Sequence, residues 1–195
     1  GTETDGRTDS TPSDVRDATV NAHGLVYGVV QPSDLLTVLD PVGHRATMIT
    51  IPSKAPPILT DTPTSPYYGD DPIWARRSDP RSVAMDGSGR VWLTGRIRGA
   101  DEQPSFCTDD SNSFANYFPL ERGRRQVFMY DPETETFSEI DTCFSADHNQ
   151  LGEDERFYYG FRDGVGWIDT EIWDESQDSE VSQGWCPTVL DTNGD

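Results

Sequence analysis

The sequence predicts an all-β chain, namely a β-propeller with four-stranded antiparallel blades, of which about three are present as part of a larger ring. A polar turn containing Gly or Asp is followed by a β-type segment with an aromatic residue three times, at Tyr27, Trp92 and Tyr158. A segment ending in Asp follows each of these, and the chain holds 17 Gly and 14 Pro, which favours turns over long helices. Tandem units of four short strands with regular turn signals are typical of propeller blades.

Residues 15–52 are expected to form blade 1. The segment 15–20 is its expected innermost strand, a turn follows at 21–24, and apolar segments at 25–30, 35–40 and 45–52 supply the other strands. The preceding residues 1–14 are polar and contain no apolar side chain larger than that of Pro. They are therefore expected to form a disordered polar arm.

Residues 80–142 are expected to form blade 2, in which Asp86–Gly89 is the first turn. A long loop over 53–79 separates blades 1 and 2, and an insertion over 97–124 interrupts blade 2. Residues 143–195 are expected to form blade 3, incomplete at the C-terminus, with its last strand at 186–192 after an insertion. A plain β-sandwich is the alternative, but it does not explain why turn, aromatic strand and Asp-ended strand recur in that order.

The charge balance argues against two classes of partner. The chain carries 35 Asp and Glu against 15 Lys and Arg, a net charge of -20, so nucleic acid and anionic lipid would repel it. No apolar run approaches the roughly 18 residues of a membrane span, so membrane insertion is not expected. No phosphate-cradling glycine loop is present, and no nucleotide or organic cofactor is indicated.

Propeller geometry predicts where a site would lie. The innermost strands all begin on one face of the ring, called the start face here, and both long connections fall on that face, where long loops are usually functional. Aligning the repeats brings three strand starts together there, and we expect a ligand or a Ca²⁺ or Mg²⁺ ion at this channel mouth. The ligand would be small and either anionic or polyhydroxylated. The expected ligand-binding residues are Arg16, Asp17, Arg81, Ser82 and Asn149. Asp147 is expected to be a metal ligand at the same mouth, where His148 also lies.

A structural role is the alternative for the same charges. Arg16, Asp17, Arg81 and Asp147 can instead form a ring of salt bridges that fixes neighbouring blades. The segment from Asp191 through Asn193 to Asp195 resembles the opening of a calcium-binding loop, although a simple Asx turn would explain it equally.

The chain has three cysteines, Cys107, Cys143 and Cys186. Cys107 and Cys143 both fall on the start face and are expected to form a disulfide, which leaves Cys186 unpaired. The expected localisation is secreted or periplasmic, and the disulfide is expected on that premise.

Two stretches resemble a known family. Residues 84–94 (AMDGSGRVWLT) and 127–141 (VFMYDPETETFSEID) resemble the streptogramin-lyase-like β-propellers, and 118–154 is similar to large secreted bacterial propeller proteins of that superfamily. The resemblance implies two function classes. One is an exported module that binds a small ligand or protein through its loop-bearing face. The other is a metal-assisted lyase or lactonase-type enzyme, in which His148 would be the catalytic base. The expected partners are the remaining blades, from the same protein or a partner chain.

Overall fold

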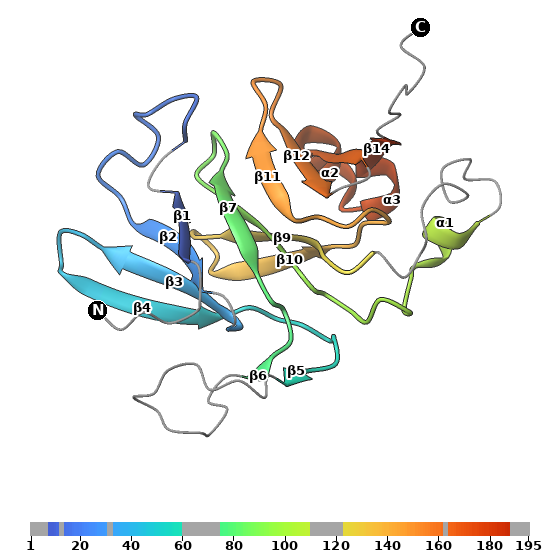
Figure 1. The fold of residues 1–195 in the computed structure, drawn as a ribbon. Coiled ribbons are helices and arrows are strands. Elements are labelled where there is room, and N and C mark those ends of the chain that lie inside the picture. Colours follow the sequence, from blue (N-terminus) through green and yellow to red (C-terminus); the bar gives the residue numbers. More distant parts are fainter. Residues whose placement is uncertain are drawn as a thin grey trace, which may run out of the picture.

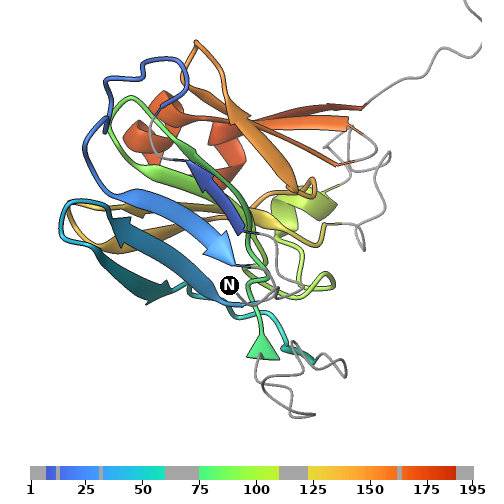
Figure 2. The same ribbon diagram turned by 60° about the vertical axis from the view of Figure 1, so that its left-hand side comes forward.

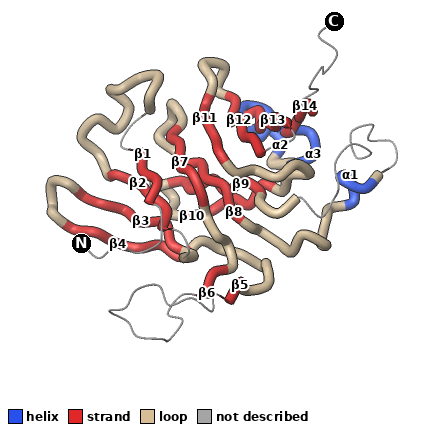
Figure 3. The backbone as a smooth tube through the Cα atoms, viewed as in Figure 1, coloured by secondary structure: helices blue, strands red, loops and turns tan. Residues whose placement is uncertain are grey.

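The computed structural model describes residues 8–11, 14–30, 33–59, 75–109, 123–161 and 164–187. These residues form three four-stranded antiparallel sheets and a two-stranded ribbon (Figures 1 and 3). In each four-stranded sheet, every strand pairs with its neighbour in the sequence. The predicted fold class is therefore confirmed as an all-β chain with three propeller-type blades that do not close a ring.

Sheet 1 consists of β1 (Thr8–Thr11), β2 (Val26–Val30), β3 (Leu35–Asp40) and β4 (Arg45–Thr50). The prediction of a disordered arm over 1–14 is wrong for Thr8–Thr11, which pair with Tyr27–Val30 as the innermost strand. The predicted innermost strand at 15–20 instead lies in the connection from β1 to β2. Because β1 is composed of Thr, Asp and Ser, its place depends on backbone pairing, and no hydrophobic pattern marks it.

Sheet 2 consists of β7 (Arg81–Met85), β8 (Val91–Gly95), β9 (Gln126–Asp131) and β10 (Thr136–Ile140). The buried carboxylate of Asp86 holds the turn before the aromatic strand of this sheet. It accepts hydrogen bonds from the backbone N–H groups of Ser88 (3.0 Å) and Arg90 (2.9 Å) and from Trp92 Nε1 (2.8 Å). One side chain thus fixes the turn and the aromatic residue that follows it.

Sheet 3 consists of β11 (His148–Leu151), β12 (Arg156–Phe161), β13 (Gly164–Asp169) and β14 (Gln183–Pro187). The insertion before β14 forms two short helices, α2 (Thr170–Ser176) and α3 (Ser179–Ser182). The last strand therefore begins earlier than the predicted 186–192, and its buried Trp185 packs into the core. The prediction that blade 3 is incomplete is wrong. It has all four strands.

Sheet 2 lies between the other two sheets (Figure 2). Alternate residues of β9 point to opposite sides: Val127 and Met129 pack with sheet 3, whereas Phe128 and Tyr130 pack with sheet 1. Trp92 stacks on Phe157 of sheet 3 with ring centroids 5.4 Å apart. Burial on both faces explains why β9 is apolar along most of its length.

The outward faces of the two outer sheets remain partly apolar. Leu39 and Met48 are 45% and 68% exposed on sheet 1, and Val165 is 47% exposed on sheet 3. These residues sit opposite the sides that pack against sheet 2.

The long connections also contain structure. The predicted loop 53–79 includes a two-stranded ribbon of β5 (Ile58–Leu59) and β6 (Ala75–Arg76), and the insertion 97–124 includes α1 (Ser105–Thr108). In the described residues, no helix is both long and apolar enough to cross a bilayer.

Candidate ligand-binding pocket

A pocket of about 480 Å³ opens where β7 begins, between the ribbon and the insertion. Figure 1 shows that β7 begins at its lower end, next to the β5–β6 ribbon. The position of the pocket agrees with the predicted start face, since both long connections contribute to its wall. The lining residues are Ile58, Asp79, Arg81, Arg96, Ala100, Arg124 and Arg125.

Two aspartates hold two of the lining arginines. Arg125 forms an ion pair with Asp79 through Nη2, and its Nη1 lies 3.6 Å from Oδ1 of Asp147. The same oxygen of Asp147 lies 3.3 Å from Nε of Arg81. Because Asp147 precedes β11, these contacts connect sheets 2 and 3 beside the pocket.

The other two arginines have different surroundings. Arg96 reaches across the ribbon, and its Nη1 donates to the carbonyl oxygens of Pro56 and Arg77, each at 3.1 Å. Arg124 is exposed and makes no hydrogen bond or ion pair with any other described residue.

The backbone around the start of β7, beside the pocket, is strained. Asp79 and Ser82 have positive φ angles of 41° and 36°, a region that residues other than glycine rarely adopt. The pairing of β7 with β8 shifts between Arg81 and Val83, so a bulge separates Arg81 from the regular ladder. Asn149 Nδ2 donates to the carbonyl of Ser82 at 2.8 Å and holds this bulge from sheet 3. Strained residues of this kind cluster at binding sites.

The insertion that carries Ala100 is fixed to the body of the fold. Buried Arg98 donates Nε to Asp141 at 2.9 and 3.0 Å and Nη2 to Gln103 at 2.9 Å. Burial raises the pKa of Asp141, and the nearby Arg98 guanidinium opposes that rise.

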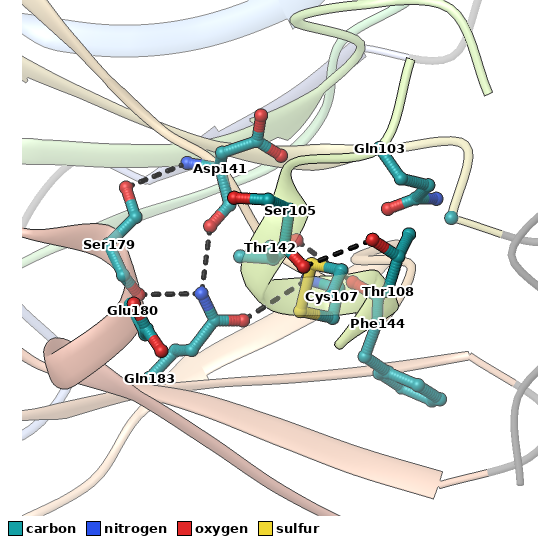
Figure 4. Close-up of a disulfide and its surroundings, with 12 residues drawn as sticks. Gln103, Ser105, Cys107, Thr108, Asp141, Thr142, Phe144, Ser179, Glu180 and Gln183 are labelled. Carbon is teal, nitrogen blue, oxygen red and sulfur yellow. Dashed lines mark hydrogen bonds between the residues drawn. A yellow bond between two sulfur atoms is a disulfide. The ribbon is translucent and has the colours of Figure 1, made fainter. Parts of the chain in front are cut away.

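A disulfide between Cys107 and Cys143 supplies a second attachment, as the sequence predicts (Figure 4). The backbone N–H of Cys143 in turn donates to Oε1 of Gln183 at 3.1 Å. The wall of the pocket is thereby connected to sheet 3. Cys186 is exposed and unpaired.

The predicted site residues separate into two groups. Arg81 lines the pocket, and Ser82, Asp147 and Asn149 adjoin it. Arg16 and Asp17 do not belong there, because the strand expected at 15–20 is a connection at the opposite end of the sheets.

Arg16 instead pairs with Asp14 and Glu155 and donates to the carbonyl of Gly152, while Asp17 accepts from Thr19. The predicted salt-bridge ring is therefore reduced to the contact between Arg81 and Asp147. A hollow of about 760 Å³ lies beside Arg16, with mostly acidic charged groups in its lining.

The predicted catalytic and metal-binding residues have less support. His148 is exposed at the first position of β11 and does not line the pocket. Asp147 faces two guanidinium groups, which oppose the binding of a cation at that carboxylate. Within the described ranges, no three His, Cys, Asp or Glu side chains are grouped to hold a metal ion. Asp191, Asn193 and Asp195 lie outside the described residues.

Of the lining residues that the sequence-based prediction missed, four are charged: Asp79, Arg96, Arg124 and Arg125. They come from three separate segments that meet only in the folded chain. The basic run at 122–125 (RGRR) in such an acidic sequence was the one signal that pointed to this position.

Three sequential four-stranded meanders packed face to face define the molecule as part of a β-propeller. Two solved structures are similar to it, each with a TM-score of 0.34. One is a streptogramin B lyase, 14% identical, with 87% of this chain and 52% of that chain covered. The other is virginiamycin B lyase from Staphylococcus aureus, 10% identical, with 96% of this chain and 61% of that chain covered.

This chain thus spans between half and two thirds of the length of those structures. Neither a protein-family model nor a curated protein matches the sequence. The propeller assignment therefore depends on the strand order and sheet packing described above.

Proposed function

We propose that the chain is a propeller module that binds a small ligand in the pocket at the start of β7. The observation that carries this proposal is the convergence of both long connections on one concave site of about 480 Å³. Pockets of this size accommodate small organic molecules.

The construction of the pocket supports a binding role. Strained Asp79 lines the pocket, strained Ser82 adjoins it, and the wall is held by a buried arginine and a disulfide. A preformed wall lowers the entropic cost of binding, because fewer protein groups must become ordered when the ligand binds. The contacts of Asp147 favour this role over a metal-assisted lyase or lactonase reaction at the channel mouth.

Two further parts of the proposal concern the setting of the module. The disulfide supports export, since such bonds persist in oxidising compartments. The exposed apolar residues on the outward faces of sheets 1 and 3 support coverage by further blades, from the same protein or a partner chain.

A substitution that fills the pocket tests the binding site. Ala100 is half-buried in the wall, so Ala100→Trp would place an indole in the space that a ligand needs. The wild type and this variant are screened by NMR against a library of small acids, sugars and aromatic compounds. We expect compounds that bind the wild type to lose at least tenfold in affinity for Ala100→Trp.

Two matched variants interpret the result. Val42→Trp places the same side chain in an exposed turn, where Val42 is 78% exposed, and should leave binding unchanged. Val15→Trp fills the acidic hollow beside Arg16 instead. Ligands that are lost with Val15→Trp and kept with Ala100→Trp would overturn the proposal.

A further inference from the structure

We propose that the pocket recognises its ligand through an oxyanion group, that is, a carboxylate, phosphate or sulfate, and not through hydroxyl groups alone. This inference rests on the proposed function, because it assigns the ligand class of the same pocket. It also decides between the two ligand classes that the sequence left open.

The charge of the pocket is opposite to that of the chain. Acidic residues outnumber basic ones by 35 to 15, yet the described lining contains four arginines and a single aspartate. A concave site concentrates such a local positive potential, because its low-dielectric walls focus the field. A small anion would therefore be attracted to this site despite the net charge of -20.

Arg124 differs from most of the described basic residues in its pairing. Basic residues in an acidic chain are expected to find carboxylates, and most described ones do, whereas Arg124 contacts none of the described carboxylates. Those that form ion pairs are Arg16, Arg45, Lys54, Arg81, Arg90, Arg98, Arg125 and Arg156. The five N–H donors of Arg124 therefore face the pocket and solvent without a described partner.

Arg81 offers further donors beside it. Its Nε faces Asp147, but neither terminal nitrogen donates a hydrogen bond to another described residue. Arg125 is held against Asp79, so it contributes mainly positive potential from a fixed position. Two guanidinium groups with unused N–H pairs match the oxygens of carboxylate, phosphate and sulfate, which arginine binds in a bidentate manner.

Direct binding at constant ionic strength tests the assignment. Chemical shifts of the arginine Nε–H groups are followed while glucose, glucuronate, phosphate or sulfate is added, with sodium chloride adjusted to keep ionic strength fixed. Glucose and glucuronate differ by one carboxylate, so this pair isolates the charge. Shifts are preferred to melting temperatures because phosphate and sulfate stabilise most proteins by exclusion from their surface.

We expect saturable shifts with at least one of the three oxyanions and none with glucose. Arg124→Gln should weaken binding roughly tenfold or more, as expected for a lost hydrogen bond between charged groups. Arg45→Gln is the matched control, because Arg45 lies on β4 with its side chain 79% exposed, and it should leave binding unchanged. Tighter binding of phosphate or sulfate would indicate a tetrahedral group, and tighter binding of glucuronate a carboxylate.

Two results would overturn the inference. Absence of a saturable shift with all three oxyanions would remove it, and so would equal losses in Arg124→Gln and Arg45→Gln. If neutral compounds bound the wild type and lost affinity in Ala100→Trp, the pocket would bind ligands of another class. If Ala100→Trp also had no effect on any ligand, the proposed binding site itself would fail.

Discussion

Removal of the disulfide should cost about 4 kcal/mol of stability in this molecule. Cys107 and Cys143 are 36 positions apart, and closing a loop of that length removes entropy from the unfolded chain equivalent to about 4 kcal/mol at 25 °C. We expect Cys107→Ala/Cys143→Ala to lower the midpoint of thermal unfolding by roughly 10 °C, given the size of the chain. Alanine is preferred to serine because Cys107 is buried, and a buried hydroxyl group would add a cost of its own.

Urea unfolding measures the effect and its origin. The substitutions are made in a Cys186→Ser background, since that exposed thiol could otherwise exchange with the disulfide. The variant should show a lower free energy of unfolding and a higher m value, because its unfolded chain is less restricted. A loss below about 1 kcal/mol would refute the reasoning. It would also be refuted if a reducing agent destabilised the double variant as much as it destabilises the protein that has the disulfide.

Two further predictions concern buried carboxylates. Asp86→Ala should lower the free energy of unfolding by about 3 kcal/mol, because it leaves the Trp92 indole N–H buried without an acceptor. The control Asp40→Ala, which removes turn contacts at a less buried site, should cost less in the same urea titration. Arg16 lowers the pKa of Asp14, so the stability from this pair is present above pH 4 or so and is lost as the pH falls further. The stability difference between wild type and Asp14→Asn should therefore shrink from pH 7 to pH 3, and a constant difference would contradict this account.

The turn and the aromatic residue of sheet 2 were predictable because one side chain holds both of them. Asp86 fixes both the turn and the position of Trp92, so the motif survives as a pattern in the sequence. The strand β1 was not predictable in this way. Thr8–Thr11 pairs through its backbone and contains no apolar residue, so local composition indicates an arm.

This one misplacement explains the error in the candidate site. Taking 15–20 as a strand moved Arg16 to the wrong end of the blade, whereas Arg81 was placed correctly because β7 begins where the repeat indicates. Arg96 and Arg124 lie on either side of a long insertion, and only the closed sheet brings them to one pocket. The spacing of residues along the chain therefore does not predict that these two arginines line the same pocket.

The lengths of the connections between strands have a consequence for folding kinetics. Sheets 1 and 3 connect their second and third strands through short links at 31–34 and 162–163, whereas sheet 2 must close over 96–125 before β8 can pair with β9. Closing a loop of that length costs about 2 kcal/mol more than closing a short one. Both outer sheets pack against sheet 2, so the slowest sheet to form is the one on which their docking depends. Early folding intermediates should therefore contain sheets 1 and 3 as separate meanders, which dock only after sheet 2 has formed.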